Sequence, residues 1–189
     1  MTKRRLRVIL LCIGLLIVLS LAVLRGPGPP LYRMTVLPSL GGEYVTPYGM
    51  NDHDQIVGIA QTAEGETHLF LWDREKGMQD LGAVTGSHVG INNAGQIVGT
   101  MVDPNGKGQA FLWDPNGGRQ LLGMLGGIHS YADAMNNLGQ VVGTVDMSAG
   151  VYHAFLWDRA GGMRDLGPGR ACTINNAGEI ILYTPAGVL

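Results

Sequence analysis

The sequence predicts an all-β fold, a small β-propeller of about four blades, and three observations support this prediction. First, a stretch that ends in a Trp-Asp pair and a glycine turn recurs three times, as HLFLWDREKGMQDLG at 68–82, QAFLWDPNGGRQLLG at 109–123 and HAFLWDRAGGMRDLG at 153–167. Second, paired polar residues recur at separations of 41, 44 and 39, beginning at Asn51, Asn92, Asn136 and Asn175. Third, a tryptophan follows the first three of these asparagines by 21 residues each time. Constant spacing within a repeat and variable spacing between repeats is typical of stacked modules.

Each repeat predicts four short strands. The first strand leads into the asparagine pair, and a turn containing Ala-Gly or Leu-Gly separates it from a second strand such as 96–99. A variable polar loop such as 103–108 precedes the third strand, and a glycine turn leads to the fourth. The repeats are expected at about 44–82, 86–123, 129–167 and, in part, 170–189.

The third strand predicts how the sheets pack. Ala154, Phe155, Leu156 and Trp157 are apolar in succession, so both faces of this strand need cover. Face-to-face stacking of small sheets provides that cover, and radial stacking with a period of about 40 to 50 residues is the pattern of a propeller. An open solenoid or prism is the alternative arrangement.

The two ends of the domain predict how the ring closes. The segment 32–42 resembles a fourth strand with its exit turn, and the segment 171–189 supplies a first and a second strand. Combined, the N- and C-terminal strands would form a fourth blade, and closure would remove the open sheet edges. An array that closes by dimerising is the alternative.

The N-terminus predicts export. Four basic residues precede a 17-residue apolar run, Val8 to Leu24, which as a helix would span roughly 25 Å. The basic flank places the remainder outside the cytoplasm. We expect residues 1–25 to form a membrane anchor, or alternatively a signal peptide cleaved after Ala22, followed by a stiff Pro/Gly linker at 26–31 and the repeat domain at 32–189.

Charge and cysteine content limit the function classes. After Arg25 the chain has 8 basic and 15 acidic residues, a net charge of about −7, which argues against nucleic acid as a partner. The two cysteines, Cys12 and Cys172, form no CxxC motif, and Cys172 is expected to be a buried small hydrophobe.

The ordered motifs resemble the HAF-repeat family of probable extracellular bacterial repeats. The triplet that names the family stands at His153-Ala154-Phe155, and the surrounding pattern of Ile-Asn-Asn, Gln-x-Val-Gly, Phe-Leu-Trp and Asp-Leu-Gly covers roughly 32–183. The resemblance implies an exported, β-rich repeat protein and implies no reaction.

The polar residues of the repeats predict structural roles, and no catalytic, metal-binding or cofactor-binding residue is assigned. The asparagines are expected to cap turns through their side chains, and so are the repeated acids Asp73, Asp114, Asp158, Asp80 and Asp165. We expect His68 and His153 to bond to backbone. Core packing is expected for the tryptophans Trp72, Trp113 and Trp157.

These observations favour a non-catalytic binding or scaffolding module at the cell envelope, with an envelope protein or a surface glycan as partner. The variable segments 83–90, 124–134 and 168–173 are the candidate binding face. The alternatives are a glycan-binding module and a propeller-type hydrolase or lyase. The best acid–histidine cluster for such an enzyme is Asp52, His53 and Asp54.

Overall fold

The computed structural model describes residues 34–85, 88–103 and 105–184. The chain divides into two compact parts, Met1–Val36 and Leu37–Leu189, and the described residues of the first part form no regular secondary structure. The expected helix at 8–24 and the linker at 26–31 lie outside the described residues. Within the described ranges, no helix has the length and apolarity needed to cross a membrane.

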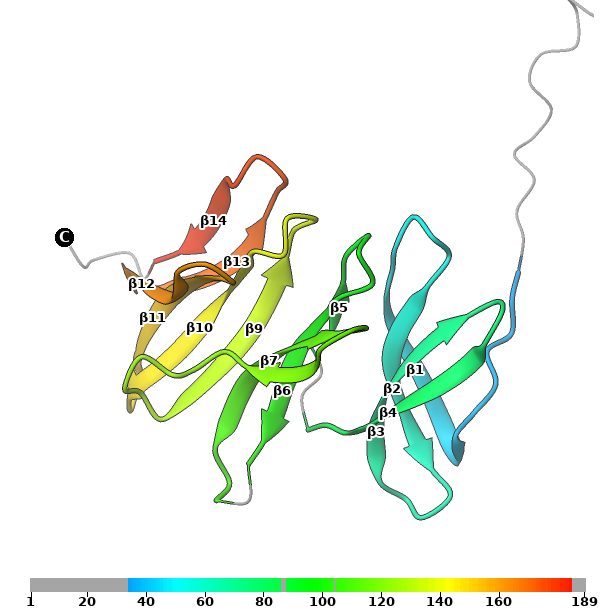
Figure 1. Ribbon diagram of the computed structural model, residues 1–189. Helices are drawn as coiled ribbons and strands as arrows, with labels where there is room; N and C mark the ends of the chain where they lie inside the picture. Colours follow the sequence, from blue (N-terminus) through cyan, green and yellow to red (C-terminus); the bar gives the residue numbers. More distant parts are fainter. Residues whose placement is uncertain (1–33, 86–87, 104, 185–189) are drawn as a thin grey trace, which may run out of the picture. The chain divides into compact units, whose positions relative to one another are not determined.

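The described part of the chain forms three four-stranded antiparallel sheets and a hairpin, all connected in chain order (Figure 1). The first sheet comprises β1 (Gly41–Met50), β2 (Ile56–Thr62), β3 (Thr67–Asp73) and β4 (Gly77–Ala83). The second sheet comprises β5 (Gly90–Ile91), β6 (Ile97–Val102), β7 (Gly108–Asp114) and β8 (Gly118–Leu121). The third sheet comprises β9 (His129–Met135), β10 (Val141–Ser148), β11 (Val151–Asp158) and β12 (Gly162–Pro168). The C-terminal hairpin comprises β13 (Arg170–Ile174) and β14 (Ile180–Tyr183).

This arrangement confirms the all-β prediction and the four strands per repeat. The registers repeat as well: Ile56 pairs with Trp72, Ile97 with Trp113 and Val141 with Trp157. The repeat spacing in the sequence therefore corresponds to equivalent positions in successive sheets.

The expected closure by the two termini is not seen among the described residues. Between Met34 and Ser39 there is no strand, and Leu40 forms an isolated bridge to Thr62. Leu37 and Leu40 pack against Phe70 in the core of the first sheet. Sequence similarity to a fourth strand did not determine pairing here, because these two leucines are half-buried against the first sheet instead.

The turn after each asparagine requires a left-handed residue. Gly95, Gly139 and Gly178 adopt φ values of 73°, 74° and 83°, and Asp54 adopts 58° at the equivalent position of the first repeat. Glycine adopts this region without strain, and aspartate tolerates it better than most residues. The turn therefore keeps one shape in all four repeats.

Apolar clusters lie between consecutive sheets and cover both faces of the third strands. One cluster joins Leu69 and Leu71 of β3 to Phe111 of β7, and another joins Leu112 of β7 to Val141 of β10. A third joins the third sheet to the hairpin. The four residues from Leu69 to Trp72 are all buried, as the unbroken apolar run predicted. Of the tryptophans, Trp72 and Trp157 are buried and Trp113 is half-buried.

A bulge in β9 and a glycine in β10 shape the first two strands of the third sheet. In the third sheet Val142 pairs with Ala134 and Gly143 with Ala132, so Asp133 is the extra, bulged residue of β9. A Cβ on Gly143 would collide with the Tyr131 carbonyl oxygen and would lie 2.6 Å from the Phe155 ring. This close approach explains the glycine of the Val-Gly motif.

Candidate binding site

The first asparagine of each pair links its own turn to the next repeat. Asn136 Oδ1 accepts hydrogen bonds from the backbone N–H groups of Leu138 and Gln140, both at 3.0 Å. Its Nδ2 donates to Gln140 Oε1 at 2.7 Å and to the carbonyl of Asn175 at 3.0 Å. Asn51 and Asn92 make the same bonds, which confirms the predicted turn-capping role and adds a contact between repeats.

The second residue of each pair forms a parallel rung. The Asn137 N–H donates to Asn176 Oδ1 at 2.9 Å, and the Asn93 N–H donates to Asn137 Oδ1 at 2.9 Å. The Asp52 N–H donates to Asn93 Oδ1 at 3.1 Å. Together the two rows form what we call the asparagine ladder, defined by the following residues: Asn51, Asp52, Asn92, Asn93, Asn136, Asn137, Asn175 and Asn176.

The acid–histidine cluster of the first repeat belongs to this ladder. Asp52 Oδ2 accepts a hydrogen bond from Asn93 Nδ2 at 2.7 Å. The His53 backbone N–H donates to Asn51 Oδ1 at 3.0 Å, and Asp54 occupies the left-handed turn position. These bonds use one carboxylate oxygen of Asp52 to join the first two repeats.

The other repeated polar residues cap turns, with one addition. Asp158 Oδ1 accepts from the backbone of Ala160 and Gly161, and Asp73 and Asp114 accept equivalent bonds, as predicted. The expectation that His68 bonds to backbone is wrong. Its Nδ1 lies 2.9 Å from the Asp80 carboxylate, and His153 pairs with Asp165 in the same way.

The His–Asp pair is a cross-strand contact between the third and fourth strands. In the second sheet the equivalent positions hold Gln109 and Leu121, so both partners differ together. A histidine without its carboxylate, or the reverse, would lose this bond, which explains why the two positions change as a pair.

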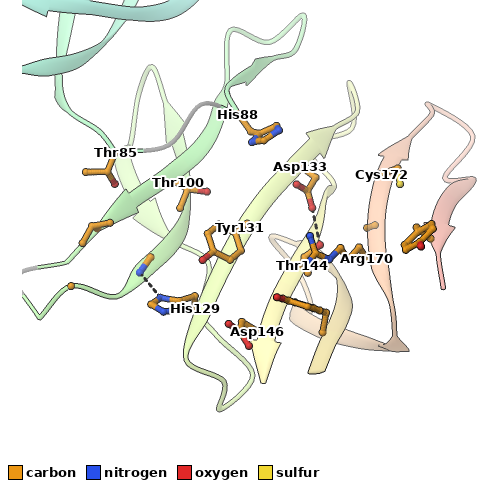
Figure 2. A pocket seen from close by; sticks show the side chains of 16 residues that line it. Thr85, His88, Thr100, His129, Tyr131, Asp133, Thr144, Asp146, Arg170 and Cys172 are labelled. Carbon is orange, nitrogen blue, oxygen red and sulfur yellow. Dashed lines mark hydrogen bonds between the residues drawn. The ribbon is translucent and has the colours of Figure 1, made fainter. Parts of the chain in front are cut away.

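A pocket of about 830 Å³ is lined by none of the ladder residues (Figure 2). This volume lies within the usual range for small-ligand sites. The second and third sheets and the hairpin all contribute to it. Its lining residues are Thr85, His88, Thr100, Val102, Gly106, Gly108, His129, Tyr131, Asp133, Thr144, Asp146, Tyr152, Arg170, Ala171, Cys172 and Tyr183.

Asp133 is a half-buried ionisable group in the pocket wall. Its Oδ2 accepts a hydrogen bond from Thr144 Oγ1 at 2.9 Å, as Figure 2 shows. Burial raises the pKa of Asp133, and this outweighs the lowering by the Thr144 hydrogen bond and by the positive charges of His88 and Arg170. Asp133 is therefore a carboxyl group that an incoming hydrogen-bond donor or cation would stabilise in its ionised form.

Further polar groups surround this carboxyl. The guanidinium carbon of Arg170 lies 3.8 Å from the centroid of the Tyr152 ring, a cation–π contact that holds the cation at the pocket wall. His129 Nδ1 accepts a hydrogen bond from the Gly108 N–H at 2.9 Å, which fixes the ring (Figure 2). Asp146 Oδ1 is buried without a hydrogen-bond partner among the described residues.

The bulge decides which side chains reach the pocket. Asp133 and Cys172 are both bulged residues at equivalent positions, three residues before Asn136 and Asn175. The prediction that Cys172 is buried is wrong, because the bulge turns its side chain outward and leaves it exposed. Bulges commonly redirect a side chain at functional sites.

The pocket is where the repeats differ most. The bulge position holds Tyr48, Val89, Asp133 and Cys172 in successive repeats. The variable segments 83–90, 124–134 and 168–173 supply Thr85, His88, His129, Tyr131, Asp133, Arg170, Ala171 and Cys172, half of the lining. Asp146, Tyr152 and Thr144 were missed, because they lie on second and third strands that resemble their equivalents. Aligning the repeats position by position would have detected them.

Among the described residues, no group of three or more His, Cys, Asp or Glu side chains is placed to hold a metal ion. In comparisons with known proteins, the chain matches no family model, no curated protein and no solved structure.

Proposed function

We propose that this chain is a non-catalytic binding protein of the cell envelope, built on a β-propeller scaffold and held outside the cytoplasm. The successive sheets are its blades, and the pocket is its binding surface. The single observation that carries the proposal is the position of the pocket: it lies where the repeats stop resembling one another, whereas the ladder repeats in every sheet.

The chemistry of the pocket supports a polar ligand. Arg170 and His88 offer positive charge or hydrogen-bond donors, and Asp133 and Asp146 offer acceptors. Asp146 Oδ1 has no described partner, and a buried acceptor without one is stabilised by a donor from a ligand. An extended segment of an envelope protein provides alternating backbone donors and acceptors of this kind.

The first test compares Arg170→Ala with Arg74→Ala in the full-length protein. Both remove an exposed arginine, but Arg74 lies in the turn between β3 and β4, outside the pocket. Each variant is cross-linked in its native membranes and recovered, and co-purified proteins are quantified. We expect a stoichiometric protein partner with wild type and Arg74→Ala, and its loss with Arg170→Ala. Equal recovery with all three would exclude the pocket as the binding surface.

A glycan is the second candidate ligand, and the aromatic lining favours it. Tyr131, Tyr152 and Tyr183 all line the pocket, and Tyr131 and Tyr183 are exposed. Exposed tyrosines can stack on sugar rings while Asp133 accepts hydrogen bonds from hydroxyl groups. If a glycan is the ligand, the bait is recovered without protein, it binds sugars on an array, and Tyr131→Ala abolishes that binding.

The location outside the cytoplasm is supported by the N-terminal sequence pattern. Protease added to spheroplasts should degrade the repeat domain if it is exported, and should spare it if it is cytoplasmic. The intact mass of the recovered protein separates the two forms of export, because cleavage after Ala22 removes 22 residues and an anchor keeps them.

A further inference from the structure

Successive sheets stack through an apolar contact that recurs between neighbouring repeats. In the C-terminal hairpin, the residue that would make this contact with a following repeat is uncovered. Six residues after the first asparagine of each pair, Val57, Val98 and Val142 are at most 1% exposed. The equivalent residue of the hairpin, Ile181, is 62% exposed. The difference arises because the first three residues are covered by the next repeat along the chain, whereas no described residue covers Ile181.

The first sheet leaves the other side of the same contact uncovered. From the second repeat onward, the residue before the first asparagine of each pair packs on the preceding repeat. In the hairpin this residue, Ile174, is 6% exposed. Its equivalent in the first sheet, Met50, is 67% exposed.

The asparagine ladder ends in the same complementary way. Asn51, Asn92 and Asn136 are buried and each donates to the carbonyl of the next repeat, whereas Asn175 is exposed and its Nδ2 donates to Glu179 alone among the described residues. At the other end Asp52 stands where the other repeats have asparagine. A carboxylate accepts hydrogen bonds and donates none, which suits the accepting end of the ladder.

We propose that a second copy of this chain docks its first sheet onto the C-terminal hairpin, and that two copies close head to tail. Met50 of one copy then covers Ile181 of the other. Asn175 Nδ2 donates to the carbonyl of Asn51, and the Asn176 N–H donates to Asp52, as in the rungs within the chain.

We assign the docking partner of the hairpin as a second copy because the contact continues an interface that the chain already forms between its own repeats. Met50 and Ile181 are both largely exposed, so the two ends of one chain do not cover each other. Two copies, each with three sheets and a hairpin, supply six four-stranded blades and two two-stranded ones, a total of eight that lies within the usual range for propellers. A head-to-tail contact that closes leaves no open end for further growth. This inference rests on the stacking alone and needs no ligand in the pocket.

The test is site-directed cross-linking of two differently tagged full-length chains, co-expressed and extracted in detergent. One chain carries Asp52→Cys and the other Asn176→Cys, both in a background of Cys12→Ser and Cys172→Ser. A short thiol-specific cross-linker is added. In the equivalent rung within the chain the Asn137 N–H lies 2.9 Å from Asn176 Oδ1, so a single chain with Asn137→Cys and Asn176→Cys is the positive control.

We expect a product of twice 20.1 kDa that carries both tags, and its loss when Ile181→Asp is added to the Asn176→Cys chain. Met50→Asp in the other chain should abolish it as well. Leu138→Asp is the matched control, because Leu138 is 71% exposed and lies in a turn outside both end faces.

Two results would overturn the proposal while the positive control reacts. One is no product between chains. The other is cross-linking only within a chain that carries both cysteines, which would assign closure to the protein's own termini. When every chain carries both Asp52→Cys and Asn176→Cys, a series of products larger than two chains would overturn closure at two copies. A failure here leaves ligand binding by the pocket intact, because Arg170→Ala tests that separately.

Discussion

The asparagine ladder and the pocket both involve the first strands of the repeats, but they differ in how constant their residues are from one repeat to the next. The ladder keeps its residues and its hydrogen bonds in each repeat: Asn51, Asn92 and Asn136 are all buried and bonded to the next repeat. A few residues earlier on the same strands, the bulge position holds a different side chain in each repeat: Asp133 and Cys172 line the pocket, whereas Val89 packs on the apolar cluster between the first two sheets. The contrast teaches that one portion of the strand holds the sheets together, whereas the other varies in sequence from repeat to repeat and is the part for which we propose ligand binding.

The largest effect on stability is expected at the glycine that permits the bulge. Gly143→Ala places a Cβ against the Tyr131 carbonyl and 2.6 Å from Phe155, so the third sheet must shift. We expect a loss of about 3 kcal/mol or more in the free energy of unfolding, because backbone cannot move aside as a flexible side chain does. Chemical denaturation measures it. Gly117→Ala is the control, since its Cβ would lie 3.8 Å from Asp114 Cβ, and a similar loss there would contradict the argument.

The next largest effect is expected in the ladder. Asn136→Ala removes a 4% exposed amide and leaves the Leu138 and Gln140 N–H groups without their partner. It also takes from the Asn175 carbonyl one of its two hydrogen bonds, the other coming from the Gly178 N–H. We expect a loss of about 2 to 3 kcal/mol, because unsatisfied buried groups are penalised. Asn137→Ala removes an exposed side chain that accepts one bond from Asn93 and should lower stability by about 1 kcal/mol. Equal losses would show that burial does not govern the ladder.

A smaller effect with a defined pH dependence is expected in the pocket. Because the pKa of Asp133 is raised by burial, its ionised form is less favourable in the folded state than in the unfolded state. Its contribution to stability is therefore fully present below the unfolded pKa and is lost as pH rises through the folded pKa. Asp133→Asn should be more stable than wild type at neutral pH, and the difference should narrow as pH falls through the raised folded pKa and be absent below about 4. Thermal unfolding across pH measures this, and a variant that is less stable at neutral pH would contradict it.

The smallest effect is expected at the cross-strand His–Asp pair. The hydrogen bond to Asp80 raises the pKa of His68 against an opposing effect of burial. The pair therefore stabilises the fold below the ordinary histidine pKa of 6.5, and this is lost as pH rises through the folded pKa. Against the effect of burial, the hydrogen bond from the Gly82 N–H and then the contacts of His68 lower the pKa of Asp80, so the gain falls away again when Asp80 is protonated in acid.

The test is His68→Gln, which introduces the residue found at Gln109. We expect a loss of at most about 1 kcal/mol near pH 6, shrinking toward pH 8, since the pair is partly exposed. A loss that does not change with pH would assign the contribution to packing instead of charge.

The repeat spacing was sufficient to predict the strands and the core. Trp72, Trp113 and Trp157 fall at one position, and each pairs with the equivalent second-strand residue. Apolar character on both faces of Leu69–Trp72 required cover on both faces, and stacking provides it. Turn capping by Asn136 and Asp158 was predictable for a similar reason, since the bonds lie within a few residues.

The pocket and the pairing of the ends were not predictable in this way. Cys172 was expected to be buried because it is apolar and lies in a strand, but a bulge turns it outward. The segment before β1 was expected to pair with the C-terminal strands, but Leu37 and Leu40 pack on the first sheet. Bulges and long-range pairings depend on residues that are distant in sequence, so local pattern did not reveal them.

By itself, the sequence determined that this protein consists of repeated four-stranded sheets, because the short apolar strands, glycine turns and paired asparagines are local and recur within each repeat. The tertiary structure alone decided that the asparagines join one repeat to the next. It also decided that Asp133, Thr144 and Arg170 share one pocket, and that the contact between repeats is left open at Ile181 and Met50. These features arise from the packing of one sheet on another, and that packing brings together side chains that lie some forty residues apart in the sequence.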